Sequence, residues 1–279
     1  MTDPMKDQHV LITGGSAGIG KAAAKALAAR GANVTVHGRD AGRARAAATE
    51  IRQATRNQAV TPLTFDLASL SDVRRAADDF RRTHPRLDVL ICNAGLFLPK
   101  RELTPAGHER TFAGIYLGHF LLTQLLLDSV KKAPEGRIIF VSCPPGSAKV
   151  HFDDMALENG YSTLKAQYHA KGAMLMFMRD LARRLARSNT TSNSMLPGYM
   201  IKTDLLSRMS LPMRLTVRWF GITPEQGAEP QVWLASAPEL KGVSGKHFHR
   251  FKEKPVQGQA ADDPECRRLW DLSMKMVGL

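Results

Sequence analysis

The sequence is poor in cysteine, and this shortage excludes two classes of protein. Its 279 residues include only Cys92, Cys143 and Cys266. Three cysteines so far apart cannot form the disulfide framework of a small secreted domain, and none has the paired spacing of a zinc site. We therefore expect reduced thiols and no metal centre.

Long hydrophobic runs are also lacking. The first residues, Met1 to Gln8, form a short polar segment without the apolar core of a secretory signal, and an apolar strand follows at once. We find no later run that is long enough to span a bilayer. The sequence therefore predicts a cytoplasmic protein without a transmembrane segment.

Acidic residues are outnumbered, with 26 against 39 lysines and arginines, so the formal net charge is +13. An excess of this size can indicate an acidic partner such as a nucleic acid. A dinucleotide phosphate or an anionic substrate explains part of the excess more simply, so we expect no nucleic-acid partner. The positive charges are spread over solvated faces of predicted helices rather than massed, for example Arg43, Arg45 and Arg52; Arg74, Arg75, Arg81 and Arg82; and Arg183, Arg184 and Arg187.

What the sequence does contain is an alternation of short apolar, β-branched runs with longer segments of helical period. This alternation is typical of a parallel sheet with helices on both faces. A hydrophobic content of 43% is enough to fill the core of one large domain, which we expect to cover residues 1–279. The predicted strands are His9–Ile12, Asn33–His37, Val60–Phe65, Asp88–Cys92, Arg137–Val141, Thr191–Met195 and one near Lys246–Phe248.

Two segments near the end of the chain depart from this alternation. Residues 204–221 have no strand pattern and are rich in Leu, Met, Trp and Arg, which predicts a helical lid over a large hydrophobic substrate. A basic amphipathic helix packed on the domain, or one that lies on a membrane surface, fits the same pattern. The tail, residues 257–279, is predicted to end in a short helix around Arg267–Lys275. The sequence does not determine the oligomeric state, and a homodimer stays open.

A glycine-rich turn, Thr13-Gly14-Gly15-Ser16-Ala17-Gly18-Ile19-Gly20, follows the first predicted strand. The helix after it is predicted over Ile19–Ala29, with Gly31 as its stop. In this place glycines allow a tight turn and a close approach of the backbone to a pyrophosphate, and the helix N-terminus attracts the anion. The sequence therefore predicts a doubly wound α/β fold of the Rossmann type that binds a dinucleotide.

The glycine spacing resembles the short-chain dehydrogenase/reductase family. The resemblance extends from about His9 to the C-terminus, and Leu117-Gly118-His119-Phe120 is most similar to the retinol-dehydrogenase-like branch. It implies a set of cofactor-binding residues in chain order: Gly14, Ser16, Gly18, Ile19 and Gly20 at the pyrophosphate; Asp66 and Leu67 at the adenine; Asn93, Ala94 and Gly95 at the adenine ribose; and Pro197, Gly198 and Thr203 at the nicotinamide.

The end of the second predicted strand indicates which dinucleotide is bound. Enzymes that use NAD place an acidic residue here to bond the ribose 2′-hydroxyl. This chain has Gly38 followed by Arg39. A guanidinium pairs with a 2′-phosphate, whereas an acid repels it. We therefore predict NADP(H) as the cofactor, although an arginine at the end of a strand can also be merely solvated.

The resemblance further implies four catalytic positions: a proton-transferring tyrosine, a lysine that lowers its pKa, a serine that steadies the substrate oxygen, and an asparagine that supports a water relay. Only the lysine is present, as Lys171, which is also expected to contact the cofactor. Gln167 occupies the tyrosine position, four residues earlier. Cys143 occupies the serine position, and Ile115 the asparagine position.

These replacements make ordinary carbonyl reduction slow. Glutamine cannot cycle a proton at neutral pH, and loss of a general acid typically lowers the rate by about 10²–10⁴. Tyr168 follows Gln167, and a rotation of about 100° per helical residue points it away from the face of Gln167 and Lys171. Other candidates in or near the site are Ser142; Cys143 as a thiolate beside Lys171; His151 with Asp153 or Asp154; and Tyr116 and Tyr199.

Three functions stay open. The favoured one is a repurposed enzyme that catalyses a cyclisation, isomerisation, pericyclic step or dehydration of a hydrophobic metabolite, with NADP(H) structural rather than consumed. The second is an NADPH-dependent reductase or dehydrogenase with an unusual proton donor. The third is a non-catalytic protein that binds NADP(H). The fold is shared by all three and does not separate them.

Overall fold

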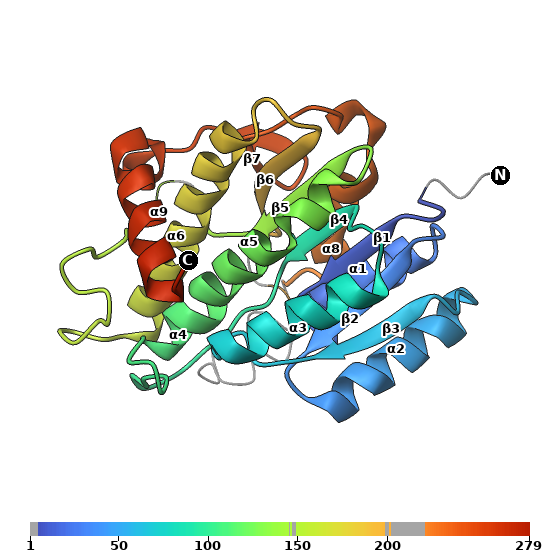
Figure 1. Ribbon diagram of the computed structural model, residues 1–279, viewed down its shortest axis with the longest axis horizontal. Helices are drawn as coiled ribbons and strands as arrows, with labels where there is room; N and C mark the ends of the chain where they lie inside the picture. The colour runs from blue at the N-terminus through green and yellow to red at the C-terminus, as the bar shows by residue number, and fades with distance from the viewer. Residues whose placement is uncertain (1–4, 145, 147–148, 199–200, 202–220) are drawn as a thin grey trace.

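Eight strands form the centre of the structure, in the order β3-β2-β1-β4-β5-β6-β7-β8 (Figure 1). The computed structural model describes residues 5–144, 146, 149–198, 201 and 221–279. All neighbouring strands are parallel except β7 and β8. The strands are β1 His9–Ile12, β2 Asn33–Gly38, β3 Val60–Thr64, β4 Val89–Cys92, β5 Gly136–Val141, β6 Thr190–Leu196, β7 His247–His249 and β8 Lys252–Lys254.

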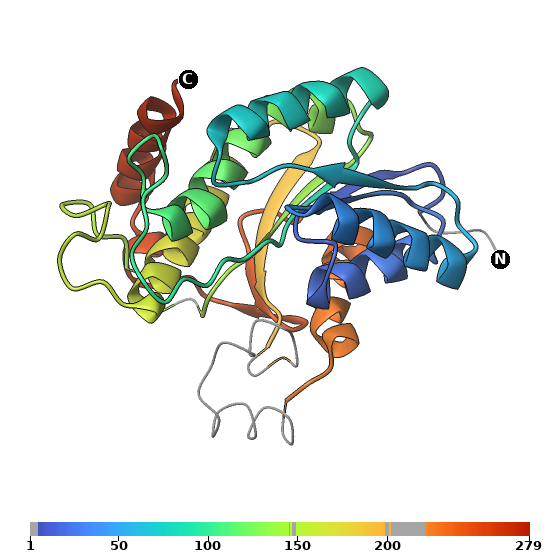
Figure 2. The ribbon, with the colours of Figure 1, turned by 90° about the horizontal axis from the view of Figure 1, so that it is seen from below.

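Helices cover both faces of this sheet, as the doubly wound prediction requires. Figure 2 shows α1, α2 and α8 on one side and α3, α5 and α6 on the other. The seven predicted strands are confirmed to within one residue at each end, and β8 was missed. The main helices are α1 Gly18–Ala28, α2 Ala41–Thr55, α3 Leu70–Thr83, α4 Arg110–Phe112, α5 Gly118–Lys131, α6 Thr163–Arg184, α8 Pro224–Ser236 and α9 Asp263–Val277.

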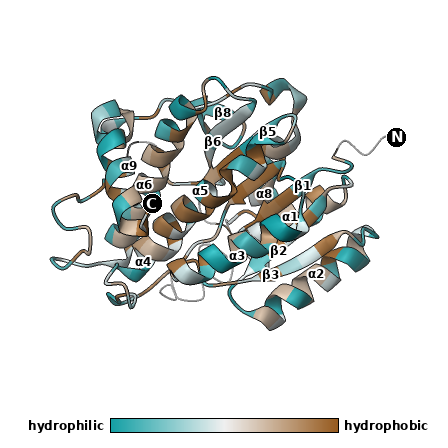
Figure 3. Ribbon diagram, viewed as in Figure 1, coloured by the Kyte–Doolittle hydropathy of each residue, from teal (hydrophilic) through white to brown (hydrophobic). Residues whose placement is uncertain are grey.

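The central strands are apolar on both faces because each face packs against helices. In β1, Val10 and Ile12 belong to the core beneath α1, α2 and α8, whereas Leu11 belongs to the core beneath α3, α5 and α6. Figure 3 shows β1 and β5 as strongly hydrophobic ribbons between helices whose outer faces are polar. The continuous apolar runs that predicted buried strands therefore reflect burial on both sides.

The segment from Arg110 to Lys131 corrects the expectation that no run is long enough to span a bilayer. It combines α4, a π-helical turn over Ala113–Leu117 and α5, and by length and composition alone it is apolar enough to cross a membrane. In this structure 78% of its most apolar stretch is buried. Its residues, among them Phe120 and Leu121, pack in the core with α3 and α6. The segment is thus the central helix on one face of the sheet.

The C-terminal tail is more ordered than the sequence suggested. A 3-10 turn over Gly258–Ala261 leads into α9, which is longer than the helix predicted around Arg267–Lys275. Leu269 and Trp270 of α9 are buried, and Asp263 pairs with Arg179 and Arg183 of α6. The predicted lid, residues 204–221, lies outside the described residues apart from Gly221.

Acidic neighbours offset much of the positive charge on the helices. In α3, Arg75, Arg81 and Arg82 each pair with an aspartate three residues earlier. In α6, Arg183 and Arg184 both pair with Asp180, which is buried. The pairs in α3 are exposed, and exposed pairs contribute little to stability. They agree with the expectation that these arginines lie on solvated helix faces.

Candidate functional site

The glycine-rich turn leaves β1 and enters α1 with the geometry that a pyrophosphate requires. Gly14 and Gly18 have φ angles of +66° and +53°, which residues other than glycine adopt only with strain. A Cβ atom on Gly20 would lie 2.3 Å from the carbonyl oxygen of Gly14. Ala17 caps α1 without a side-chain hydrogen bond, so the first amides of α1 have no side-chain cap of this kind in the described chain. These features fit an anion bound at the helix N-terminus.

Strand β4 holds the turn in place through Asn93 and Ala94. The hydroxyl of Thr13 accepts hydrogen bonds from the backbone amides of Asn93 at 2.8 Å and of Ala94 at 3.0 Å. The side-chain amide of Asn93 donates to the Thr13 carbonyl at 2.8 Å, and Gln231 of α8 donates to Asn93 Oδ1 at 3.1 Å. A Cβ on Gly95 would meet no atom within 4 Å, so the space beside Gly95 is open.

The ends of β2 and β3 supply the residues expected beside the adenosine. A Cβ on Gly38 would lie 2.7 Å from Ser16 Oγ, so the end of β2 packs closely against the glycine-rich turn. Arg39 follows as an exposed side chain and has no ion pair within the described residues. Asp66 Oδ1 accepts the amide of Ala68 at 2.9 Å, and Asp66 also pairs with Arg110 at 3.3 Å. The structure thus leaves Arg39 accessible for a phosphate.

Helix α6 carries Gln167, Tyr168 and Lys171 of the predicted catalytic residues, and Ser142 and Cys143 follow β5. Lys171 Nζ donates to the carbonyl of Val141, the last residue of β5, at 2.5 Å. The side-chain amide of Gln167 donates to the carbonyl of Leu96. Ser142 Oγ donates to the carbonyl of Lys171 at 2.9 Å, which fixes this hydroxyl to the helix backbone. Cys143, next to it, is buried.

Burial changes the acidity of the groups at this end of β5. Desolvation lowers the pKa of Lys171 to about 8, and the nearby thiols of Cys143 and Cys92 oppose that shift. Desolvation also raises the pKa of Cys92 to about 12, so this thiol is neutral and inert. Lys171 is therefore a group at the predicted catalytic positions that exchanges a proton near neutral pH.

Comparison with known proteins identifies the family. The family model for short chain dehydrogenase matches residues 8–212. The chain belongs to the short-chain dehydrogenase family. Human retinol dehydrogenase 14 is 38% identical over 99% of this chain and 88% of its own length, and human retinol dehydrogenase 13 is 38% identical over 97% and 84%. The expected retinol-dehydrogenase-like branch is thus confirmed.

Solved structures agree with this family assignment. A protein from Mycobacterium paratuberculosis has a TM-score of 0.78 at 28% identity and covers 98% of this chain and 94% of its own. A short chain dehydrogenase from Escherichia coli CFT073, solved in complex with NADPH, has a TM-score of 0.70 at 26% identity and covers 90% and 100%.

Ile115, predicted to occupy the family's asparagine position, lies in the π-helical turn between α4 and α5. Ile115 is buried there, and its carbonyl oxygen accepts a hydrogen bond from Nδ1 of His119 at 2.6 Å. Tyr116 does not reach a substrate site, contrary to our expectation. It is fully buried, its hydroxyl bonds Ser273 Oγ at 2.7 Å, and burial raises its pKa far above the usual value. An apolar core position explains both residues.

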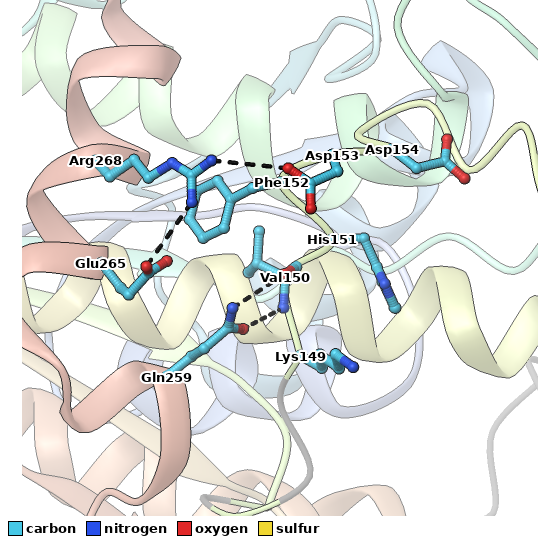
Figure 4. Close-up of a pocket in the computed structure, with 9 residues that line it drawn as sticks. All are labelled: Lys149, Val150, His151, Phe152, Asp153, Asp154, Gln259, Glu265 and Arg268. Carbon is cyan, nitrogen blue, oxygen red and sulfur yellow. Dashed lines mark hydrogen bonds and ion pairs between the residues drawn. The ribbon is translucent and has the colours of Figure 1, made fainter.

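The loop after β5 lines a cavity that is separate from Gln167 and Lys171 (Figure 4). The cavity has a volume of about 290 Å³, and its lining includes neither Lys171 nor Gln167. The amides of Glu158 and Asn159 bond the Asp154 carboxylate and keep its pKa low. Partial burial, with Lys165 and Lys149 nearby, lowers the pKa of His151. The lining residues are Lys149, Val150, His151, Phe152, Asp153, Asp154, Gln259, Glu265 and Arg268.

A Tyr-x-x-x-Lys sequence, Tyr161 to Lys165, lies six residues before the Gln-x-x-x-Lys sequence of Gln167 and Lys171. Tyr161 precedes α6 and donates its hydroxyl proton to the carbonyl of Leu98 at 3.0 Å. Lys165 Nζ donates to the carbonyl of Asn159 at 2.7 Å. Neither side chain bonds to the end of β5, so the motif does not replace the missing tyrosine.

Two of the residues expected at the nicotinamide, Pro197 and Gly198, follow β6. Pro197 is buried and Gly198 has a φ angle of +123°, a backbone conformation open to glycine. Thr203 and Tyr199 lie outside the described residues. Tyr168 is half-buried on α6, next to Gln167. The roles of these residues stay predictions.

We predict that Arg39→Asp weakens NADPH binding by about tenfold or more, since a hydrogen-bonded charge pair contributes about 1.5–3 kcal/mol. Binding of NADH should change little or improve. Calorimetric titration of both cofactors measures this, with Arg45→Asp on the exposed face of α2 as the charge-matched control. Equal affinity of the native chain for NADPH and NADH contradicts the assignment.

We also predict that restoring the family residues raises hydride transfer. Gln167→Tyr with Cys143→Ser and Ile115→Asn should increase NADPH-dependent reduction of a hydrophobic ketone by about a hundredfold, because Lys171 is already in place. Single-turnover oxidation of NADPH measures the rate. A folded triple variant that binds NADPH and ketone without any gain shows that the positions are assigned wrongly.

Proposed function

We propose that this chain is an NADP(H)-dependent oxidoreductase that interconverts an alcohol and a carbonyl on a hydrophobic small molecule, with Lys171 carrying the proton. The observation behind this proposal is the position of Lys171. Its amine lies at the end of β5, on the helical face of Gln167, and has a pKa of about 8. A general acid or base is most effective when its pKa lies near the working pH.

The cofactor would lie along the ends of β1, β2 and β4. Gly14 and Gly18 would give the pyrophosphate close access to the backbone, and the exposed Arg39 would pair with the 2′-phosphate. Bound NADPH supplies the hydride. Structural relatives solved with NADP or NADPH support this choice of cofactor.

The chain's own contribution is to bind, orient and protonate. In reduction, the Lys171 ammonium gives its proton to the substrate oxygen and becomes a neutral amine. Burial favours that neutral product, because desolvation destabilises the charged form. The Val141 carbonyl, which accepts from Lys171 Nζ, keeps the amine directed at the end of β5. The thiol of Cys143 is a weak donor that orients the oxygen in place of serine.

The substrate class rests on the relatives and on the sequence of the lid. Proteins named retinol dehydrogenase align over nearly the whole chain, and their names specify an apolar alcohol. Leu205, Leu206, Trp219 and Phe220 belong to the segment predicted to cover the substrate. A hydrophobic alcohol or its carbonyl partner is the class that fits both observations.

We predict that the pH dependence reports Lys171. For reduction, kcat/KM should be flat below pH 8 and fall about tenfold per pH unit above it, because only the ammonium gives a proton. For alcohol oxidation, kcat/KM should rise toward pH 8 and then level off. Steady-state kinetics from pH 6 to 10 measures both limbs.

Lys171→Arg keeps a cation but not a proton that exchanges near pH 8. It should lose about a hundredfold or more in kcat and lose the inflection near pH 8. Lys165→Arg, on the same helix but bonded to Asn159, is the matched control. An unchanged inflection in Lys171→Arg assigns the proton to another group.

A non-redox reaction is the second candidate, and Gln167 favours it. The residue at the tyrosine position holds a hydrogen bond to Leu96 and has no proton to give. Cyclisation, isomerisation, a pericyclic step or dehydration needs only a folded substrate and a polarised oxygen, which Gln167, Lys171 or Cys143 would supply. NADP(H) would then form part of the pocket wall.

The ratio of NADPH oxidised to product formed separates the two candidates. We predict one NADPH consumed per product, with deuterium from 4-deuterated NADPH on the product carbon. Mass spectrometry of the product measures the label. If product forms while NADPH is not consumed and the product carries no deuterium, the oxidoreductase proposal is wrong and the non-redox reaction is supported.

A further inference from the structure

Two buried histidines contact the glycine-rich turn from different elements. His37 lies near the end of β2 and is 3% exposed, and His119 lies in α5 and is fully buried. Neither belongs to the sets of residues assigned above to the cofactor or to the reaction. His119 bonds to Thr13 and His37 bonds to Gly14, which are consecutive residues of the turn.

The hydrogen bonds of His37 fix its tautomer. Nε2 lies 3.0 Å from the carbonyl oxygen of Phe65, which can only accept, so Nε2 carries the proton. In the neutral ring Nδ1 then has a lone pair, and it accepts the amide of Gly14 at 3.2 Å. The ring also packs on Phe65, with 3.9 Å between ring centroids. His37 thus links the turn to the residue that precedes Asp66.

The hydrogen bonds of His119 fix the opposite tautomer. Nδ1 lies 2.6 Å from the carbonyl of Ile115 and must donate to it. Nε2 therefore accepts, and its partner at 2.7 Å is the hydroxyl of Thr13. That hydroxyl already accepts the amides of Asn93 and Ala94, so it donates its proton, and His119 Nε2 at 2.7 Å is a nearer acceptor than the Ile91 carbonyl at 3.2 Å. The turn is thereby joined to the π-helical turn that holds the family's asparagine position.

We propose that His37 and His119 are positioning residues that hold Gly14 and Thr13 in place and thereby set the affinity for NADP(H). The turn has little room to move, since a Cβ on Gly14 would lie 2.9 Å from Ala94 Cα. Both rings stay neutral at neutral pH, because burial lowers the pKa of His37 to about 4 and that of His119 to about 3. Their donor and acceptor patterns are therefore permanent.

The inference rests on the proposed binding of NADP(H), but not on which reaction follows. Asparagine and glutamine can separate the two contacts of each ring. An asparagine amide reaches the place of Nδ1, and a glutamine amide reaches the place of Nε2. His37→Asn keeps an acceptor for Gly14, whereas His37→Gln keeps only the contact to Phe65. At the other site, His119→Gln keeps an acceptor for Thr13, whereas His119→Asn keeps only the contact to Ile115.

The experiment is calorimetric titration of the four variants with NADPH at neutral pH, with the free energy of unfolding measured for each. We expect His37→Asn and His119→Gln to stay within about twofold of the native Kd. We expect His37→Gln and His119→Asn to bind about fivefold or more weakly, the effect of one hydrogen bond. The loss at His119 is limited because the Thr13 hydroxyl can turn to the Ile91 carbonyl at 3.2 Å.

The preferred amide is thus predicted to invert between the two positions, which a general loss of stability does not produce. The same preference at both positions, or affinities that follow the free energy of unfolding, overturns the proposal. Nitrogen chemical shifts of the native protein test it without any variant: His37 must be protonated at Nε2 and His119 at Nδ1, and either tautomer reversed also overturns it. If the native chain does not bind NADPH, the proposed function fails instead.

Discussion

The site depends on the hydrogen bonds of the Thr13 hydroxyl. Two backbone amides at the end of β4 donate to it, and His119 of α5 bonds to it. A strand end, a helix and the glycine-rich turn therefore meet at one oxygen atom. A buried polar group is costly unless its hydrogen bonds are satisfied, and this one uses its donor and both of its lone pairs. The turn keeps its shape because these partners fix it, and the close contacts at Gly14 and Gly20 follow.

The scaffold and the reaction are separable in this chain. The features that hold the turn depend on backbone geometry and on small residues, and they lie within residues 8–212, which the short chain dehydrogenase model matches. The predicted catalytic positions depend on side chains alone, since Gln167 and Lys171 lie on one face of α6 and Cys143 follows β5. Replacing those side chains leaves the helix and the sheet intact. The predicted replacements are therefore compatible with 38% identity to a retinol dehydrogenase over nearly the whole chain.

The sequence predicted the sheet well because both faces of each central strand are buried, so each strand is a continuous apolar run between turn residues. It missed β8, whose three residues, Lys252, Glu253 and Lys254, are charged and exposed at the edge of the sheet. It did not predict the contacts of His37 and His119 with the turn, because a single histidine in an apolar run forms no sequence motif. Their partners are backbone groups, and the fold alone brings those groups together.

Spacing in the sequence predicted which residues form the catalytic set, but it could not predict the acidity of Lys171. Lys171 has an ordinary lysine pattern, and only burial beside β5 brings its pKa to about 8. An isolated charge in such a place is unfavourable, and the thiols of Cys143 and Cys92 partly oppose the loss of the ammonium. In the proposed reaction, transfer of the Lys171 proton to a substrate oxygen removes a charge from the core, and burial favours that change because desolvation destabilises the ammonium. The same burial makes this lysine a usable proton donor near neutral pH, and the fold, not the local sequence, determines it.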